Sequence, residues 1–281
     1  MIQVLGLGLV AAILWGAHDI CVRYVSQRSG ILPSILMVLT FGFLFQLPIT
    51  YLFADWAQLD VLAFLYALAS GAFFAIGTVS LYRGFAIGPV RLVAPIVGSY
   101  PVLSIAHAIW AGQQITPIQF LAVILIISGI AIVAHGNENE SNGKKSHAVL
   151  WGLSGALSFA LSFAIGQSAA ADGAATSTIA LARLAAIVLL ISIMLILRQN
   201  KIPKRREWPL LAFMGFLDGS ALALVLYAGS RAHAEFASVT ASIFGLFTII
   251  FAWAILKEPM TRHQWCGVVV VFSAIACLGV L

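Results

Sequence analysis

Long, nearly uninterrupted apolar runs are the dominant feature of this sequence. Of its 281 residues, 62% are hydrophobic and only 9% are charged, whereas a soluble domain carries about 25% charged residues. A water-soluble fold of this size could not bury so much apolar surface, so lipid is the solvent for most of the chain. In lipid every backbone polar group must be paired internally, which leaves only helices and closed barrels. The runs are too long for barrel strands of about ten alternating residues, so we expect an all-α integral membrane protein.

The apolar runs divide the chain into ten segments, each close to the roughly 20 residues that a membrane-crossing helix needs. The breaks between them carry Gly, Pro or charge, as at Gly88-Pro89. The first run contains His18 and Asp19 and lacks a basic region before it, so we interpret it as a retained helix and not as a signal peptide. The expected spans cover residues 2–24, 31–53, 60–87, 89–111, 117–135, 148–170, 175–197, 208–230, 235–256 and 262–281.

The chain repeats itself on either side of a polar segment. We expect residues 1–136 and 148–281 to be two five-helix repeats joined by a polar linker, residues 137–147. The halves share identities at one constant offset of 145 positions, including Thr, Gln and Ser, which chance apolar matching does not readily supply. Five crossings are an odd number, so the second half enters from the opposite face and the repeats are inverted, which is typical of secondary transporters that work by alternating access. The matched pairs are Tyr82 and Tyr227, Gly84 and Gly229, Thr116 and Thr261, Gln119 and Gln264, Val123 and Val268, Ser128 and Ser273, and Ile130 and Ile275.

Basic residues gather in the loops that follow odd-numbered spans. The formal net charge of +5 therefore reflects topology and lipid headgroups, not nucleic acid. The positive-inside rule predicts that the odd-numbered loops are cytoplasmic and that the chain is a multi-pass protein of the cell (inner) membrane. The basic residues of these loops are Arg23, Arg28, Arg83, Arg91, Lys144, Lys145, Arg198, Lys201, Lys204, Arg205, Arg206, Lys257 and Arg262, whereas the loops after even-numbered spans contain only Arg231.

Several short stretches resemble the motifs of one family of membrane proteins. They are Leu14-Trp15-Gly16 in the first span, Tyr82-Arg83-Gly84-Phe85-Ala86 with Pro95 and Tyr100-Pro101 in the third and fourth, and Ile255-Leu256-Lys257-Glu258-Pro259-Met260-Thr261 with Trp265 and Gly267 before and in the last. Over nearly its whole length the chain resembles the drug/metabolite transporter superfamily, and most closely its EamA-type members. The resemblance implies a cavity lined mainly by spans one, three, four, six, eight and nine. Gln113 occupies the position at which members of the family usually have Glu in the first repeat. A role for that carboxylate in the first half of this chain is therefore in doubt.

Asp218 lies near the middle of the eighth span, where an ionisable group is costly unless it is paired or hydrated. We consider it a candidate partner for a substrate ammonium group and a candidate proton-coupling acid. The alternative is a structural ion pair with Arg183, which lies at a compatible depth in the seventh span.

His18 and Asp19 lie together in the inner part of the first span. We consider His18 a candidate for substrate binding and for proton coupling, because imidazole titrates near neutral pH. Asp19 is a second candidate for coupling. The alternatives are a hydrogen-bonded core histidine and a local salt bridge between Asp19 and Arg23, which are spaced i, i+4.

Four aromatic residues are assigned to substrate binding. Trp15 and Tyr100 fall near the middle of their spans, where aromatic faces can grip a flat or cationic solute. Tyr82 and Phe244 complete the set. The alternative for each of them is ordinary packing.

Pro95 and Pro101 flank Gly98 near the centre of the fourth span. Proline removes helix hydrogen bonds and can kink a helix. We therefore consider these three residues candidate gate elements.

Motifs of catalysis are missing from the sequence. It contains no P-loop, HExxH or GxSxG motif and no Cys/His cluster with metal-ligand spacing. We interpret Cys21, Cys266 and Cys277 as small buried hydrophobic residues. The expectation is a protein without enzyme activity, cofactor or metal.

The favoured function is secondary active or facilitative transport of a small polar or amphipathic metabolite, of amino acid or amine type, in the direction of export. The expected partners are this small-molecule substrate, the lipid bilayer and, as a candidate coupling ion, the proton; nucleic acid is not among them, and the oligomeric state stays open. An organic-cation or choline-like uptake transporter is the alternative within transport. A non-transporting membrane subunit is the alternative of another class, which the inverted repeat disfavours.

Overall fold

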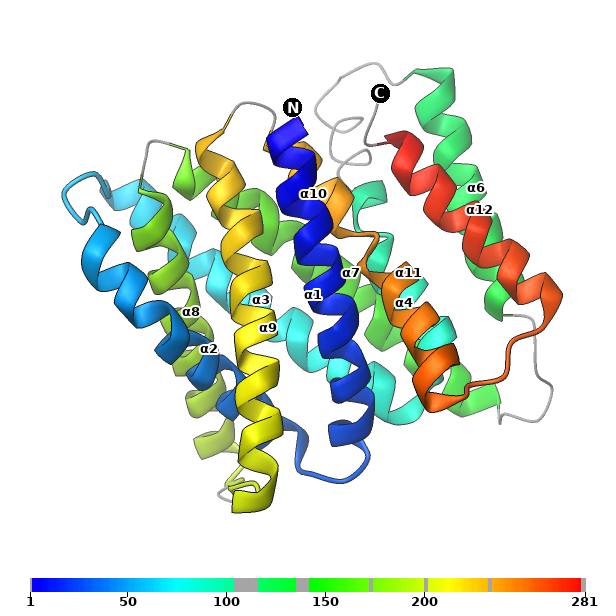
Figure 1. Cartoon of the computed structure of the whole chain (residues 1–281), viewed down its shortest axis with the longest axis horizontal. Helices are drawn as coiled ribbons and strands as arrows, with labels where there is room; N and C mark the ends of the chain where they lie inside the picture. The colour runs from blue at the N-terminus through cyan, green and yellow to red at the C-terminus, as the bar shows by residue number, and fades with distance from the viewer. Residues whose placement is uncertain are drawn as a thin grey trace.

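The computed structural model describes residues 2–103, 116–134, 142–171, 174–199, 202–231 and 234–278, and within these ranges every regular element is a helix (Figure 1). By length and composition seven helices can cross a membrane, and three shorter apolar stretches bring the number to ten. The expected ten-span, all-α membrane protein is confirmed. The elements are α1 (Ile2–Ser26), α2 (Ile31–Phe53), α3 (Val61–Ile87), α4 (Val90–Gly98), α6 (Pro117–Ala134), α7 (Asn142–Ala170), α8 (Ala175–Ile196), η1 (Arg205–Glu207), α9 (Trp208–Tyr227), η2 (Ala228–Ser230), α10 (Glu235–Ala241), α11 (Phe244–Phe251), η3 (Ala252–Leu256) and α12 (Arg262–Leu278).

Most helix boundaries agree with the expected spans to within a few residues. The exception is α7, which begins at Asn142, inside the segment 137–147 that we expected to be a polar linker. The earlier part of that segment lies outside the described residues. The part of the fourth expected span beyond Leu103 also lies outside the described residues, and so does Gln113 in the turn that follows that span.

The interpretation of the cysteines as buried residues is wrong for two of the three. Cys266 and Cys277 are exposed on the outer surface of α12, and Cys21 is half-buried. Lipid solvates apolar side chains, so an apolar run in a membrane helix does not distinguish the buried face from the outer face.

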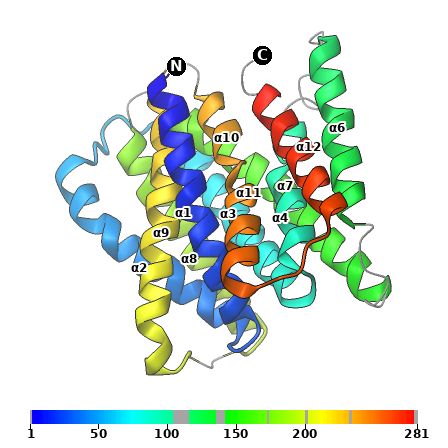
Figure 2. The ribbon, with the colours of Figure 1, turned by 45° about the vertical axis from the view of Figure 1, so that its right-hand side comes forward.

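The two halves of the chain interleave. In the described structure α3 lies against α7 and α8, α1 against α9, α10 and α11, and α2 against α8 and α9. The pair of α6 and α12 stands at one side of the bundle (Figures 1 and 2). There Gly129 and Gly267 face each other so closely that a Cβ atom on either would lie 2.8 or 2.9 Å from the other's carbonyl oxygen. Each half therefore completes the packing of the other.

Small residues also mark the crossings at the centre. Lipid provides no hydrophobic force between helices, so close backbone packing has to hold them together. A Cβ atom added to Gly42 of α2 would lie 2.8 Å from the carbonyl oxygen of Gly215 in α9. One added to Gly71 of α3 would overlap the backbone of Ala182 in α8. Side chains larger than hydrogen are excluded at both crossings.

Two helices are broken near the middle of the bundle. α4 ends at Gly98, and a turn follows at residues 99–100; α10 gives way to α11 through a turn at residues 242–243. The two breaks meet, because a Cβ atom on Gly98 would lie 2.8 Å from the carbonyl oxygen of Ser242. Gly245 likewise faces the carbonyl oxygen of Ala94 at 2.8 Å. The broken helices cross each other beside the central cavity.

Candidate functional site

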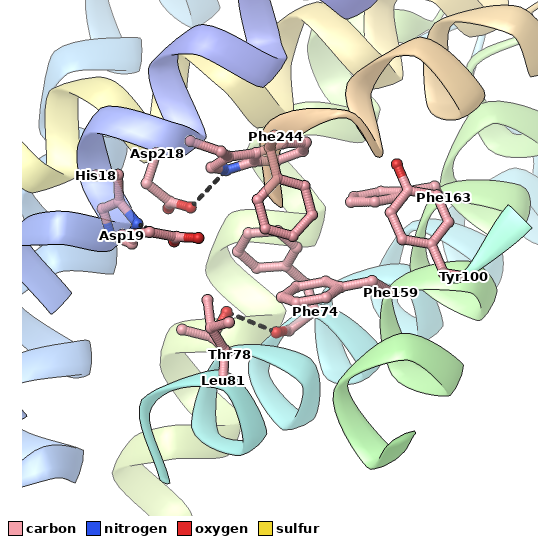
Figure 3. A pocket seen from close by; sticks show the side chains of 11 residues that line it. His18, Asp19, Phe74, Thr78, Leu81, Tyr100, Phe159, Phe163, Asp218 and Phe244 are labelled. Carbon is pink, nitrogen blue, oxygen red and sulfur yellow. Dashed lines mark hydrogen bonds and ion pairs between the residues drawn. The ribbon is translucent and has the colours of Figure 1, made fainter. Parts of the chain in front are cut away.

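A small closed cavity lies among six elements drawn from both halves of the chain (Figure 3). Its volume is about 20 Å³, enough for one water molecule but far below the roughly 300–1,000 Å³ of a typical small-molecule site. Every residue that lines it is buried, so the cavity must open before a solute can enter. The lining side chains come from α1, α3, α7, α9, α11 and the turn after α4: Trp15, His18, Asp19, Phe74, Thr78, Leu81, Tyr100, Phe159, Phe163, Asp218 and Phe244.

Asp218 lines this cavity and is also half of an ion pair. Its Oδ2 accepts a hydrogen bond from Nη1 of Arg183 at 2.6 Å, and its Oδ1 accepts one from the indole Nε1 of Trp15 at 3.2 Å. The guanidinium of Arg183 is fully buried and lies 5.2 Å from the ring centroid of Phe74. Asp218 therefore lies at the cavity, as expected of a functional residue, and also forms the ion pair with Arg183 that we gave as the alternative.

Asp19 is held by a different set of groups. Its Oδ2 accepts a hydrogen bond from the hydroxyl of Thr248 at 2.9 Å, and its Oδ1 lies 3.4 Å from Nδ1 of His18. The other ring nitrogen of His18 lies 3.5 Å from the hydroxyl of Tyr82. These contacts form a chain of polar groups that leads from the cavity toward α3.

The alternative salt bridge between Asp19 and Arg23 is wrong. Arg23 points away from the cavity, donating to the carbonyl oxygens of Phe85 and Gly88 and lying 3.6 Å from Glu258. Helical spacing put the two residues on one face, but Asp19 is drawn into the bundle by Thr248 of α11.

Aromatic rings form most of the remaining wall. Phe163 stacks on Trp15 with a centroid distance of 5.4 Å and on Phe159 at 5.8 Å, and Tyr100 meets it edge-on at 5.3 Å. Phe244 meets Trp15 edge-on at 6.3 Å. Such pairs hold each ring in a fixed orientation, so the wall is a preformed set of aromatic faces.

The residues that we expected to bind substrate divide into two groups. Trp15, His18, Tyr100, Asp218 and Phe244 all line the cavity. Tyr82 does not; it is completely buried behind His18 and contacts the cavity only through that ring.

The candidate gate residues surround the break in α4. Pro95 lies within α4, Gly98 ends it, and Pro101 follows the turn. Between them and the cavity, the hydroxyl of Tyr100 donates to the carbonyl oxygen of Ser238 in α10. The two broken helices are thus tied together beside the cavity.

Six residues at the site were not singled out from the sequence: Phe74, Thr78, Leu81, Phe159, Phe163 and Thr248. The internal repeat held a signal for one of them. At the offset of 145 positions Phe163 of α7 corresponds to His18 of α1, and the repeat could have marked it as a cavity residue.

The charges around the cavity do not balance. Asp19 and Asp218 are two carboxylates, and Arg183 is the guanidinium that faces Asp218 at 2.6 Å. Among the ionisable side chains at the site, the carboxylates therefore outnumber the guanidinium by one. Within the described part of the chain, no group of three or more His, Cys, Asp or Glu side chains is placed so that it could hold a metal ion.

The structure is that of a multi-pass helical membrane protein with a closed cavity between its halves, lined by aromatic rings and two carboxylates. The sequence model of the EamA-like transporter family matches residues 3–134 and again residues 146–280. The chain belongs to the EamA-like transporter family.

Two similar proteins each match only part of this chain. The "Putative ribose uptake protein RbsU" of Latilactobacillus sakei is 27% identical, over 59% of this chain, and the match spans only 58% of that relative. "Uncharacterized protein MJ1333.1" of Methanocaldococcus jannaschii is 24% identical, and 96% of it matches 47% of this chain. Slightly less than half of this chain therefore corresponds to nearly the whole of that second protein.

A solved structure, described only as a crystal structure of a protein, has the same fold. It superposes with a TM-score of 0.74, covering 98% of this chain and 95% of that one, at 11% sequence identity. At this identity the likeness extends to the fold alone.

Proposed function

We propose that this protein is a secondary transporter that moves a small amine across the cell membrane by alternating access. The observation that carries the proposal is the central cavity, in which aromatic faces surround two buried carboxylates, one of which is paired with the guanidinium of Arg183 outside the cavity wall. Aromatic faces attract organic cations, and the surplus carboxylate adds to that attraction. An amine or an organic cation fits this surface better than an anionic metabolite does.

The arrangement of the halves supports alternating access. In Figure 1, α1 begins at the upper end of the bundle and α7 at the lower end, which is the sense expected of inverted repeats. Contacts also come in matched pairs: α2 with α9 corresponds to α3 with α8 when the halves are exchanged. The family model matches once in each half. An exchange of conformation between such halves opens a central site to one side and then to the other.

We assign the coupling proton to His18 and Asp19. Asp19 is 1% exposed, and its hydrogen bonds come from a hydroxyl and an imidazole, so a proton shared with His18 removes an unpaired buried charge. The groups that face this pair are Thr248, Tyr82 and Asp218. Because protons enter the cell down their gradient, exchange of a proton for an amine at this site drives export.

A pentose sugar is the second candidate substrate. The relative from Latilactobacillus sakei carries ribose uptake in its name, and carboxylates such as Asp19 and Asp218 accept hydrogen bonds from hydroxyl groups. A sugar would stack on the same aromatic wall, and its binding would not depend on a second negatively charged carboxylate.

Counterflow in proteoliposomes distinguishes the candidates. Vesicles preloaded with unlabelled ethanolamine, choline or ribose are exposed to the same labelled compound, with vesicles containing Asp19→Asn as the matched control. Amine transport predicts counterflow of an amine in the wild type. In vesicles loaded with the labelled amine, an inward-directed proton gradient should accelerate its efflux in the wild type and not in Asp19→Asn. Counterflow of ribose alone would replace the amine by the sugar, and no counterflow of any of the three would contradict both assignments.

A further inference from the structure

One end of the bundle is closed by a charged contact between the two halves. Arg23, near the end of α1, donates to the carbonyl oxygens of Phe85 and Gly88 at the turn between α3 and α4. Its guanidinium lies 3.6 Å from Glu258, in the turn between η3 and α12. Glu258 in turn faces the backbone N–H of Val90, the first residue of α4, at 3.5 Å. A single guanidinium thus fixes the start of α4 against the second half.

The opposite end of the bundle is closed by an uncharged side chain. Gln167, near the end of α7, donates through Nε2 to the carbonyl oxygens of Val225 and Ala234, each at 3.0 Å. These carbonyls flank the connection between α9 and α10. Gln167 therefore connects the end of α7 to the link between α9 and α10. In the same way, Arg23 connects the end of α1 to the turn between α3 and α4.

The two contacts occupy matching places in the repeat. At the offset of 145 positions Gln167 falls one residue from Arg23, and Ala234 falls one residue from Gly88. In the sequence the position that matches Glu258 is Gln113, an uncharged residue. Both repeats thus have a side chain that donates hydrogen bonds to the connection after the third helix of the repeat. Of the two matching positions, only the one in the second repeat carries an acid, Glu258.

We propose that Arg23 and Glu258 form an ion-pair lock on one gate of the transporter, whose counterpart at the other gate is, among the side chains that the structure describes, the uncharged Gln167. The two gates then open with unequal ease, and the resting protein favours the state that keeps the Arg23 gate shut. This inference rests on the proposed alternating-access function. By the distribution of basic residues the locked gate faces the cytoplasm.

Salt distinguishes the two gates without any substitution. The side chains of Arg23 and Glu258 are 20% and 14% exposed, so dissolved ions reach the pair, and about 1 M salt shortens the screening length to roughly 3 Å. Neutral hydrogen bonds to carbonyl oxygens lack this sensitivity. High salt should therefore loosen the Arg23 gate and leave the Gln167 gate unchanged.

Hydrogen exchange in lipid nanodiscs, read by mass spectrometry, tests the lock without a substrate. Between about 0.05 M and 1 M NaCl, amides of residues 85–92 should exchange about fivefold faster, as expected for loss of a partly exposed pair, while those of residues 226–231 stay constant. Arg23→Gln keeps an amide donor for the turn and removes the charge, so it should exchange fast at both salt concentrations. Glu258→Gln removes the other charge of the pair, so its residues 85–92 should also exchange fast at both salt concentrations. Gln167→Leu should speed exchange only at residues 226–231.

Equal salt responses at the two ends, or a wild-type salt response in Arg23→Gln and Glu258→Gln, would overturn the lock. Counterflow in the same lipids separates this inference from the proposed function. Intact counterflow without the salt difference contradicts the lock alone. The salt difference without counterflow of any probe contradicts the transport proposal alone.

Discussion

The indole Nε1 of Trp15 donates a hydrogen bond to Oδ1 of Asp218 across 3.2 Å, and the two residues belong to opposite halves of the chain. Thr248 and Asp19 make a second bond of this kind, at 2.9 Å, with the acid now in the first half. Each carboxylate of the cavity is therefore fixed by a donor from the other repeat. A movement that separates α1 from α9 and α11 would break both bonds, which would link the carboxylates of the cavity to the conformation of the protein.

Replacing Asp218 by Asn should destabilise the protein, because Arg183 is fully buried and would lose its carboxylate partner at 2.6 Å. The expected loss is roughly 3–5 kcal/mol in the free energy of unfolding. Thermal unfolding of the purified protein in detergent measures it.

The double variant Asp218→Asn with Arg183→Gln is the matched control. It removes both charges, so we expect it to recover most of the stability, whereas amine counterflow should stay low because Asp218 lines the cavity. A double variant that is as unstable as the single one would show that the pair is not the source of the loss. Normal counterflow in either variant would remove Asp218 from the substrate site.

Trp15→Phe should remove one hydrogen bond and keep the aromatic stack on Phe163. A hydrogen bond to a charged group contributes about 1.5–3 kcal/mol, so the unfolding temperature should fall. Trp208→Phe provides the comparison, since that indole also donates a hydrogen bond, to Pro203, but lies at the exposed end of α9. We expect an effect within about 0.5 kcal/mol there, and equal losses in the two variants would count against a special role for the Trp15 bond.

Gly71→Ala should weaken the crossing of α3 and α8, because the new methyl group would overlap the backbone of Ala182. Overpacking of this kind costs about 1–3 kcal/mol. Gly6→Ala in α1 is the control, since no atom lies within 4 Å of the added Cβ position. Fluorescence-detected gel filtration after heating should show earlier loss of Gly71→Ala, and an unchanged profile for this variant would mean that the helices part without cost.

The topology can be tested with single cysteines placed in the loops. We expect Lys204→Cys to be protected from an impermeant thiol reagent in intact cells and Arg231→Cys to be labelled. The native Cys266 and Cys277 are exposed on the outer surface, so the experiment requires a background in which the native cysteines are replaced by Ala. Labelling at Lys204→Cys from outside, with none at Arg231→Cys, would reverse the assigned orientation.

The spans were predictable because lipid imposes a length on every crossing helix, and the charged or Gly- and Pro-containing breaks show where each one ends. The ionisable members of the site were predictable for a related reason: a buried acid such as Asp218 is costly in lipid, so its presence indicates a function or a partner. In the structure Asp218 lines the cavity and is paired with Arg183; its role in transport stays a prediction.

The apolar members of the site could not be found in this way. Phe159 and Phe163 line the cavity, while Leu153 and Leu157 of the same helix are about half exposed on its outer surface. In a soluble helix polarity would separate these two faces, but in lipid both are apolar. The contact of Asp19 with Thr248 was also out of reach, because it depends on how α1 packs against α11 and not on local spacing.

The pairing of α6 with α12 has a consequence for how the protein is made. α6 ends at Ala134 and its main partner ends at Leu278, so a ribosome must add 144 further residues, the difference of these two positions, before the pair can form. At about 5–20 residues per second this takes roughly 7–30 s. During that interval Gly129 has no partner from its own chain at the crossing with Gly267. The fifth span therefore waits in the bilayer while nearly all of the second half is synthesised, and it is among the last helices to be fixed in place.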